Sequence, residues 1–192
     1  MPEDRADIIA LVCDALSDDD RRAASDIARV RYPFISLVKQ ARAYTPRQSM
    51  RVFLRDGFRD RYSGQRLIFP ATLRLLSKLL LDEFPAHPNW KMAESHLVFW
   101  ELFPTIDHLV PVARGGADVE ENWVTTSMLR NSAKAHWTVE ELGWKLVADD
   151  CNSEWDGLTR WCLQYAEMHP DVLLDRYVRR WCNAARLALS AA

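Results

Sequence analysis

Residues 104–134 constrain the fold of this 192-residue chain more than any other stretch. The apolar run that opens the stretch predicts a strand. Pro111 and Gly115-Gly116 then require the chain to leave the sheet and turn back. The pair Val124-Thr125 predicts a returning strand, and Ser127 is a favourable N-cap for a short helix after it. The expected order is therefore strand, loop, strand and helix, within an α+β protein.

Polar side chains occupy the ends of these expected elements. Asp107 and His108 end the first strand, and Asn131 and Lys134 lie three residues apart on one face of the short helix. The order of elements predicts that a carboxylate, an imidazole and a carboxamide lie near one point. Carboxylate and amide oxygens suit Mg²⁺, and a free imidazole can take a proton from an attacking water. This set of groups suits hydrolysis of a phosphodiester, with Lys134 as a candidate contact to a neighbouring phosphate.

The combination of an Asp-His pair, a Gly-Gly turn, Asn122 and a closing Asn-x-x-Lys resembles the HNH (His-Asn-His) endonucleases. The resemblance implies a ββα-metal core embedded in a mostly helical domain. It implies that His108 is the general base and that Asp107 and Asn131 hold a divalent metal, Mg²⁺ or Mn²⁺. Asn122 matches the asparagine that braces the loop through backbone hydrogen bonds. The resemblance covers residues 107–134 strictly and residues 55–64 more loosely, and it makes DNA the expected substrate, with RNA not excluded.

Many HNH proteins hold this core with a zinc ion on two Cys-x-x-Cys pairs. The matching positions here are Asp60 with Ser63 and Ser127 with Arg130, so no structural zinc is expected. Apolar packing is expected to hold the core instead. The four cysteines have no metal-binding spacing and indicate reduced, mostly buried thiols. The candidates for this packing are Tyr62, Leu67, Phe69, Trp100 and Trp123.

The basic residues of the chain are concentrated between Lys39 and Arg66. This segment has eight basic and two acidic residues, a charge of +6, which leaves −8 for the rest of a chain whose net charge is −2. On charge alone, a solvated helix face is the better explanation. The resemblance instead favours a surface that faces a polyanion. Arginines spaced four apart from Arg47 would form one ridge on a helix. The candidates for phosphate contacts are Arg51, Arg55, Arg59 and, in the loop after the first strand, Arg114.

Aromatic and branched residues from Leu97 to Ile106 predict that the first strand is long. On such a strand Glu101, six residues before Asp107, would share its face and could support it. His87 and His96 are interpreted as hydrogen-bonded structural histidines rather than metal ligands.

Three regions are expected: an N-terminal helical region at 1–54, the nuclease core with its lead-in hairpin at 55–137, and C-terminal helices at 138–192. The chain has no apolar run of membrane-spanning length and its N-terminus is acidic, so a soluble cytoplasmic protein with no membrane partner is expected. Two alternatives to an active nuclease stay open. One is a non-catalytic DNA-binding module on the same fold. The other is a helical interaction protein whose partner docks on the C-terminal helices, with nuclease activity secondary to or dependent on that partner. A homodimer is also open, because a single HNH site cuts one strand.

Overall fold

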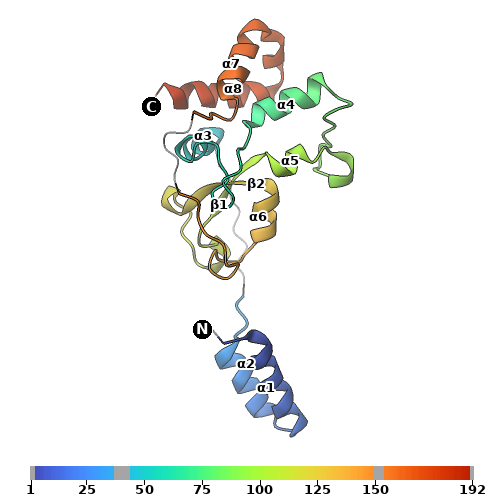
Figure 1. The fold of residues 1–192 in the computed structure, drawn as a ribbon, viewed down its shortest axis with the longest axis vertical. Coiled ribbons are helices and arrows are strands. Elements are labelled where there is room, and N and C mark those ends of the chain that lie inside the picture. The colour runs from blue at the N-terminus through green and yellow to red at the C-terminus, as the bar shows by residue number, and fades with distance from the viewer. Residues whose placement is uncertain (1–2, 37–43, 149–153, 191–192) are drawn as a thin grey trace. The chain divides into compact units, whose positions relative to one another are not determined.

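The computed structural model describes residues 3–36, 44–148 and 154–190, and the chain divides into two compact units, Met1–Val38 and Lys39–Ala192 (Figure 1). The first unit holds two helices, α1 (Arg5–Ser17) and α2 (Arg21–Arg31), whose N-caps are Asp4 and Asp20. The division falls earlier than the expected boundary at residue 54. Residues 46–55 belong to the second unit because their apolar side chains are buried in its core.

Four helices pack together in the second unit: α3 (Pro46–Arg55), α4 (Pro70–Leu79), α7 (Thr159–Met168) and α8 (Arg176–Leu189). Thr45 and Gln48 form a capping box at the start of α3. At the centre of the core, the ring of Phe53 stacks on Trp181 with centroids 6.2 Å apart, and Phe69 meets the same indole edge-on at 5.9 Å. These aromatic contacts join α3 and α8 to the segment that enters α4.

A two-stranded antiparallel hairpin lies beside this helical core (Figure 1). Strand β1 (Pro104–His108) pairs with β2 (Trp123–Ser127), so that His108 lies opposite Trp123. Helix α6 (Met128–Lys134) follows at once, with Ser127 as its N-cap. The predicted order of strand, loop, strand and helix is therefore confirmed. Two 3₁₀ turns, η2 (Val112–Arg114) and η3 (Glu120–Asn122), shape the loop between the strands.

The double glycine in this loop has a steric reason. A Cβ atom on Gly116 would lie 1.9 Å from the carbonyl oxygen of Val110, which is far inside van der Waals contact. Gly115 has a φ of +91°, in the left-handed region that glycine adopts at little cost. Only glycine therefore allows the loop to turn this closely against its own backbone.

The long strand predicted over residues 97–106 is wrong in its first half. Residues Val98–Glu101 form the short helix α5, which follows the 3₁₀ turn η1 (Met92–Glu94). The Nδ1 atom of His96 accepts a hydrogen bond from the amide of Val98 and so stabilises the first turn of α5. Glu101 is exposed on α5 and does not share a strand face with Asp107, so the supporting role expected for it is wrong as well.

Other expectations concern burial. Of the residues predicted to hold the core, Tyr62, Leu67, Phe69 and Trp123 are buried, whereas Trp100 is half-buried. Cys162 and Cys182 are buried free thiols and Cys13 is an exposed one, while Cys151 lies outside the described residues.

The 3₁₀ helix η4 (Pro170–Leu174) lies between α7 and α8. No helix in the described ranges combines the length and the apolar character needed to cross a membrane.

Asp175 at the start of α8 carries a testable electrostatic prediction. Its carboxylate accepts from the amides of Tyr177 and Val178 and pairs with Lys78 at 2.7 Å and Arg74 at 3.3 Å. Burial alone would raise the pKa of Asp175, but the hydrogen bonds from Lys78 and the two amides, with the charge of Arg74, outweigh it and lower the pKa from 3.8 to about 2.

Asp175→Ala is therefore expected to lower the free energy of unfolding by about 1–2 kcal/mol at pH 7, as the loss of a helix cap does. Because the folded-state pKa lies below the unfolded value, this stabilisation is present above pH 3.8 and is lost as the pH falls through about 2. Urea unfolding of both proteins between pH 2 and 7 measures the difference, with the exposed Asp171→Ala as control. A difference that does not shrink below pH 4 would contradict this origin.

Candidate active site

The side chain of Asp107 lies on the face of the hairpin that contacts Tyr62 and Lys134. Its Oδ2 atom accepts a hydrogen bond of 2.5 Å from the hydroxyl of Tyr62 and lies 3.0 Å from Nζ of Lys134. Burial and then the charge of Asp107 raise the pKa of Tyr62 above its ordinary value, so the phenol stays protonated and remains a donor. The carboxylate is thus held in place by one hydroxyl and one cation.

Lys134 is fully buried, with 0% of its side chain exposed. Its Nζ atom donates to the carbonyl oxygen of His108 at 2.7 Å in addition to its ion pair with Asp107. In this arrangement the ammonium is the counter-ion of Asp107 and ties α6 to the end of β1. The phosphate contact expected for Lys134 has no exposed donor to make it here.

Asn131 shares the face of Asp107. Its Nδ2 atom donates to Oγ1 of Thr105 at 3.0 Å and to the carbonyl oxygen of Ile106 at 3.1 Å. Thr105 and Asp107 are two residues apart on β1 and therefore point to the same side. In the described part of the chain, no hydrogen bond reaches Oδ1 of Asn131 or Oδ1 of Asp107. Two hard oxygen acceptors are thus left on one face.

This pair of oxygens fits a divalent cation that keeps most of its ligands as water. Mg²⁺ is commonly held by one or two protein oxygens, with waters and phosphate oxygens completing an octahedron. Within residues 3–36, 44–148 and 154–190, no three His, Cys, Asp or Glu side chains cluster closely enough to form a fully protein-ligated site. Asp107 and Asn131 are the residues that would hold such an ion.

His108 points to the opposite face of the hairpin, beside Trp123. Its Nε2 atom lies 2.8 Å from Oδ1 of Asp118 and 3.1 Å from Nε1 of Trp123, which also donates to Asp118 at 3.0 Å. Only 1% of the His108 side chain is exposed. A carboxylate on one ring nitrogen orients an imidazole and offsets the charge that the ring acquires when it takes a proton.

Asp118 is a site residue that the sequence pattern does not reveal. It lies two residues after Gly116, in the loop between the strands. An aspartate after a glycine pair is typical of any turn. Its relevance comes only from the return of the loop to the end of β1, and the weak sequence signal is its closeness to the double glycine.

Tyr44 covers the remaining side of the imidazole. Its hydroxyl lies 3.5 Å from Nδ1 and 3.4 Å from Nε2 of His108. The Tyr44 ring also packs edge-on against Trp123, with centroids 5.1 Å apart. Tyr44, Trp123 and Asp118 together therefore enclose His108.

The carboxylate of Asp107, the imidazole of His108 and the carboxamide of Asn131 were expected to lie near one point, and the structure brings two of them together. Asp107 and Asn131 lie on one face, and His108 lies on the other because neighbouring residues of a strand point to opposite sides. His108 is the last residue of β1, so the two faces meet at the end of this strand. The site is thus split across the strand end instead of being gathered in one cluster.

Asn122 makes the loop-bracing contacts predicted for it. Its Oδ1 atom accepts from the amide of Val110 at 2.9 Å. Its Nδ2 atom donates to the carbonyl oxygens of Val110 at 2.9 Å and Ala117 at 2.8 Å. These three bonds hold the start of the loop and the segment after the double glycine against the start of β2, which positions Asp118.

The arginines of the predicted basic strip mostly contact the protein itself. Three of the four spaced arginines lie on α3, which ends at Arg55, so Arg59 falls beyond the helix. Arg51 pairs with Glu120 at 2.8 Å. Arg55 donates to the carbonyl oxygens of Glu120 and Trp123 and to the carboxylate of Asp56. These contacts tie α3 to the loop beside His108.

The other two candidate arginines have similar internal contacts. Arg59 donates to the carbonyl oxygen of Gly64 at 3.2 Å. Arg114 forms an ion pair with Glu141 and also donates to the carbonyl oxygen of His136. Lys39 and Arg42 of the strip lie outside the described residues. Phosphate binding by this strip stays a prediction.

The four positions at which the sequence resemblance would place zinc ligands, Asp60, Ser63, Ser127 and Arg130, lie around the buried carboxylate of Asp60. Its Oδ1 atom accepts from the amides of Tyr62 and Ser63, and its Oδ2 atom accepts from the amide of Ser127. Nε of Arg130 lies 3.7 Å from Oδ2. A polar centre thus joins the lead-in turn to the start of α6, whereas the sequence predicts apolar packing alone for this task.

His87 and His96 each accept a backbone hydrogen bond through Nδ1, from Asn89 and Val98 respectively, in line with the structural role expected for them.

Comparison of the chain with protein-family models, with curated proteins and with solved structures returns no significant match.

Proposed function

We propose that this protein is a metal-dependent endonuclease of the HNH type that hydrolyses phosphodiester bonds in DNA. The observation that carries the proposal is the end of β1. There, His108 is paired with Asp118 at 2.8 Å, and the preceding residue, Asp107, offers a carboxylate oxygen on the same face as Asn131. A base and a pair of metal ligands at one strand end are the groups that this reaction needs.

His108 is the base in this proposal. Because Nε2 is held by Asp118, Nδ1 is the nitrogen that takes the proton from the attacking water. The water oxygen forms the new bond to phosphorus, the bond from phosphorus to the 3′ oxygen breaks, and Asp118 offsets the charge of the imidazolium that results. A bound Mg²⁺ or Mn²⁺ would supply electrostatic stabilisation of the extra negative charge on the phosphate and the leaving oxygen.

Substrate approach requires two adjustments. The hydroxyl of Tyr44 lies 3.5 Å from Nδ1, where the attacking water would have to be, so the Tyr44 side chain must move aside. A phosphodiester must also lie across the end of β1 to reach both faces of the hairpin. Tyr44 adjoins the N-terminal end of α3, whose arginines line the loop next to His108, so a strand bound there would be suitably placed to displace it.

The test is nicking of supercoiled plasmid by the full chain in Mg²⁺ or Mn²⁺, with EDTA as the control. Conversion of supercoiled DNA to the open circle, abolished by EDTA, is the expected result. An absence of nicking with either metal, by protein shown to be folded, would contradict the proposal.

A second candidate is a DNA-binding module that is silent alone or is activated by a partner. The observation that favours it is the enclosure of His108, which is 1% exposed and faces Tyr44, Trp123 and Asp118. This candidate predicts that the protein shifts labelled duplex DNA in a gel without cutting it. Retention of DNA with no nicking would thus select it over the first.

A further inference from the structure

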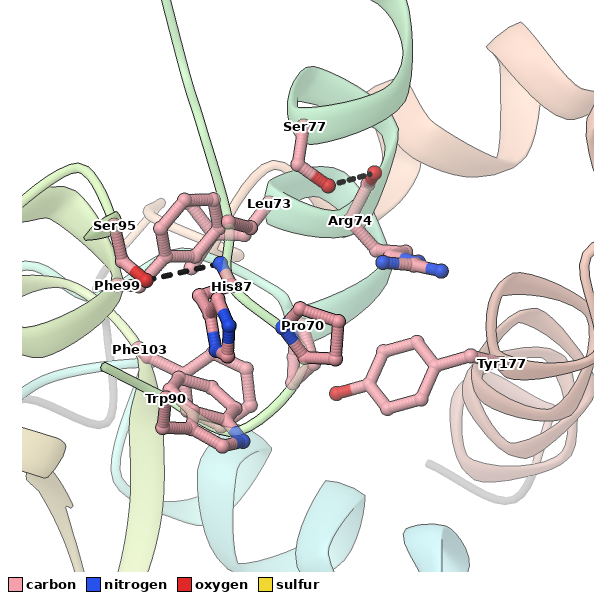
Figure 2. A pocket seen from close by; sticks show the side chains of 12 residues that line it. Pro70, Leu73, Arg74, Ser77, His87, Trp90, Ser95, Phe99, Phe103 and Tyr177 are labelled. Atoms are coloured by element: carbon pink, nitrogen blue, oxygen red, sulfur yellow. Dashed lines mark hydrogen bonds between the residues drawn. The ribbon is translucent and has the colours of Figure 1, made fainter. Parts of the chain in front are cut away.

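An aromatic pocket lies among α4, α5, α8 and the irregular segment 84–97, away from the end of β1 (Figure 2). Its volume is about 240 Å³. Pockets for drug-sized ligands span roughly 300–1,000 Å³, so this one suits a single flat ring system. The rings that line it are Trp90, Phe99, Phe103 and Tyr177, together with the imidazole of His87.

Trp90 is the most exposed part of this aromatic wall. Its residue is 41% exposed, and its ring meets Phe103 edge-on with centroids 5.1 Å apart. The backbone at Trp90 has a φ of +54°, which a bulky residue adopts only at a cost. The fold thus holds a large indole, half in solvent, at the wall of a cavity.

Two cations lie on α4, the helix that forms one wall of the pocket. Arg74 is among the residues that line the pocket, and Lys78 follows one turn later, next to the lining residue Ser77; both cations pair with Asp175. The two cationic side chains are each 43% exposed, whereas the carboxylate between them is 9% exposed. The pocket lining contains no Asp or Glu. Arg74 and Lys78 therefore present two positive charges above one largely covered negative charge, while near the segment 84–97 the carboxylate of Glu94 lies 3.6 Å from Nε2 of His87.

Planar aromatic walls beside two exposed cations on α4 suit a flat ligand that carries an anion. We propose that this pocket binds a nucleotide, with its base against Trp90 and Phe103 and its phosphate at Arg74 and Lys78. Stacking of a base on an aromatic side chain and attraction of its phosphate to Arg or Lys are the two forces with which proteins hold single-stranded nucleic acid. Figure 2 shows Arg74 extending from α4 on the side of Tyr177, with Trp90 and His87 on the other side of Pro70.

The nucleotide has two sources, a strand of nucleic acid or a free mononucleotide. Phe103 immediately precedes β1, and five strand residues at about 3.3 Å each put the pocket roughly 17 Å from the end that carries His108. A strand that is cut at the end of β1 could thus place one unpaired base in the pocket. This source rests on the proposed nuclease function, whereas binding of a free nucleotide does not.

The binding test uses the full chain in EDTA, so that cleavage plays no part. The probes are adenosine monophosphate, adenosine and a short single-stranded oligodeoxyadenylate, each titrated by calorimetry. We expect adenosine monophosphate to bind more tightly than adenosine. If the oligonucleotide binds more tightly than adenosine monophosphate, a strand of nucleic acid is the source of the nucleotide. If adenosine monophosphate binds and the oligonucleotide does not, the source is a free nucleotide. Failure of all three probes to bind overturns the proposal.

Two variants locate the binding. Trp90→Gly removes the ring and suits the left-handed backbone, so the fold is retained. This variant is expected to raise the dissociation constant of every probe that binds by about tenfold, the loss expected for one stacked base. Arg74→Gln removes one of the two proposed phosphate contacts, leaves Lys78 to pair with Asp175, and is expected to reduce the preference for the phosphorylated probe.

The matched control is Trp161→Ala, which removes an indole of nearly equal exposure, 40% against 41% for Trp90, from α7 outside the pocket. It is expected to bind all probes like the wild type. Equal affinities in Trp90→Gly and the wild type would overturn the assignment to this pocket. The binding assay excludes metal, so its result is independent of the nicking assay. If the protein binds nucleotide but does not nick plasmid, only the proposed nuclease function is rejected. If it nicks plasmid but its affinity for nucleotide does not depend on Trp90, only the assignment to this pocket is rejected.

Discussion

His108→Ala is expected to reduce metal-dependent nicking of supercoiled plasmid by about 100-fold or more, the usual contribution of a general base. In the proposed reaction, Nδ1 of this imidazole takes the proton of the attacking water once Tyr44 has moved aside, while Asp118 holds Nε2. Nicking rates measured at one Mg²⁺ concentration for wild type and variant give the effect directly.

A second variant separates chemistry from stability. His108 is buried against Trp123, so its removal leaves a cavity beside the indole, which lowers the free energy of unfolding by about 1–3 kcal/mol. His108→Gln retains much of the volume and a donor to Asp118 but cannot take a proton near neutral pH. Loss of nicking in both variants, with thermal unfolding of the glutamine variant close to the wild type, supports the role of a base. Equal cutting by the wild type and both variants would indicate a different active site.

The fold around the site could be predicted from local signals. A proline and a double glycine end β1 and force a turn, branched residues begin the return, and Ser127 caps α6. These signals are local because they depend on the conformational limits of each residue, and the hydrogen bonds of Asn122 follow once the loop closes. The double glycine in particular is required by the approach of Gly116 to the carbonyl of Val110.

The parts that could not be predicted depend on tertiary contacts. Residues 98–101 have strand-forming side chains, yet the amide of Val98 donates to His96 at the start of a helical turn, and Phe99 is buried against neighbouring elements. The burial of Lys134 follows from the way α6 lies over Asp107, which no spacing reveals. The same applies to Asp118, a loop residue whose contact with His108 exists only after the loop has folded back.

The carboxylate of Asp60 shows how a buried polar group can hold distant segments of a core together. It is fully buried and joins two segments 67 residues apart through its hydrogen bond to the amide of Ser127. Its second oxygen fixes the turn at Tyr62 and Ser63, and Tyr62 in turn donates to Asp107. The carboxylate of Asp60 therefore supports the position of the proposed metal ligand indirectly.

Asp60→Ala is accordingly expected to lower the free energy of unfolding by about 3–5 kcal/mol, because it leaves several buried donors without an acceptor, at about 1–3 kcal/mol each. The loss would leave the amides of Ser127 and Tyr62 without acceptors and Arg130 without its counter-ion. Guanidinium unfolding, followed by near-ultraviolet circular dichroism, measures this change in the free energy of unfolding, and Asp82→Ala, at an exposed aspartate, is the matched control. Asp60→Asn retains one acceptor oxygen and is expected to lose less. A loss below about 1 kcal/mol in Asp60→Ala, the range of an exposed ion pair, would mean that apolar packing alone holds this core.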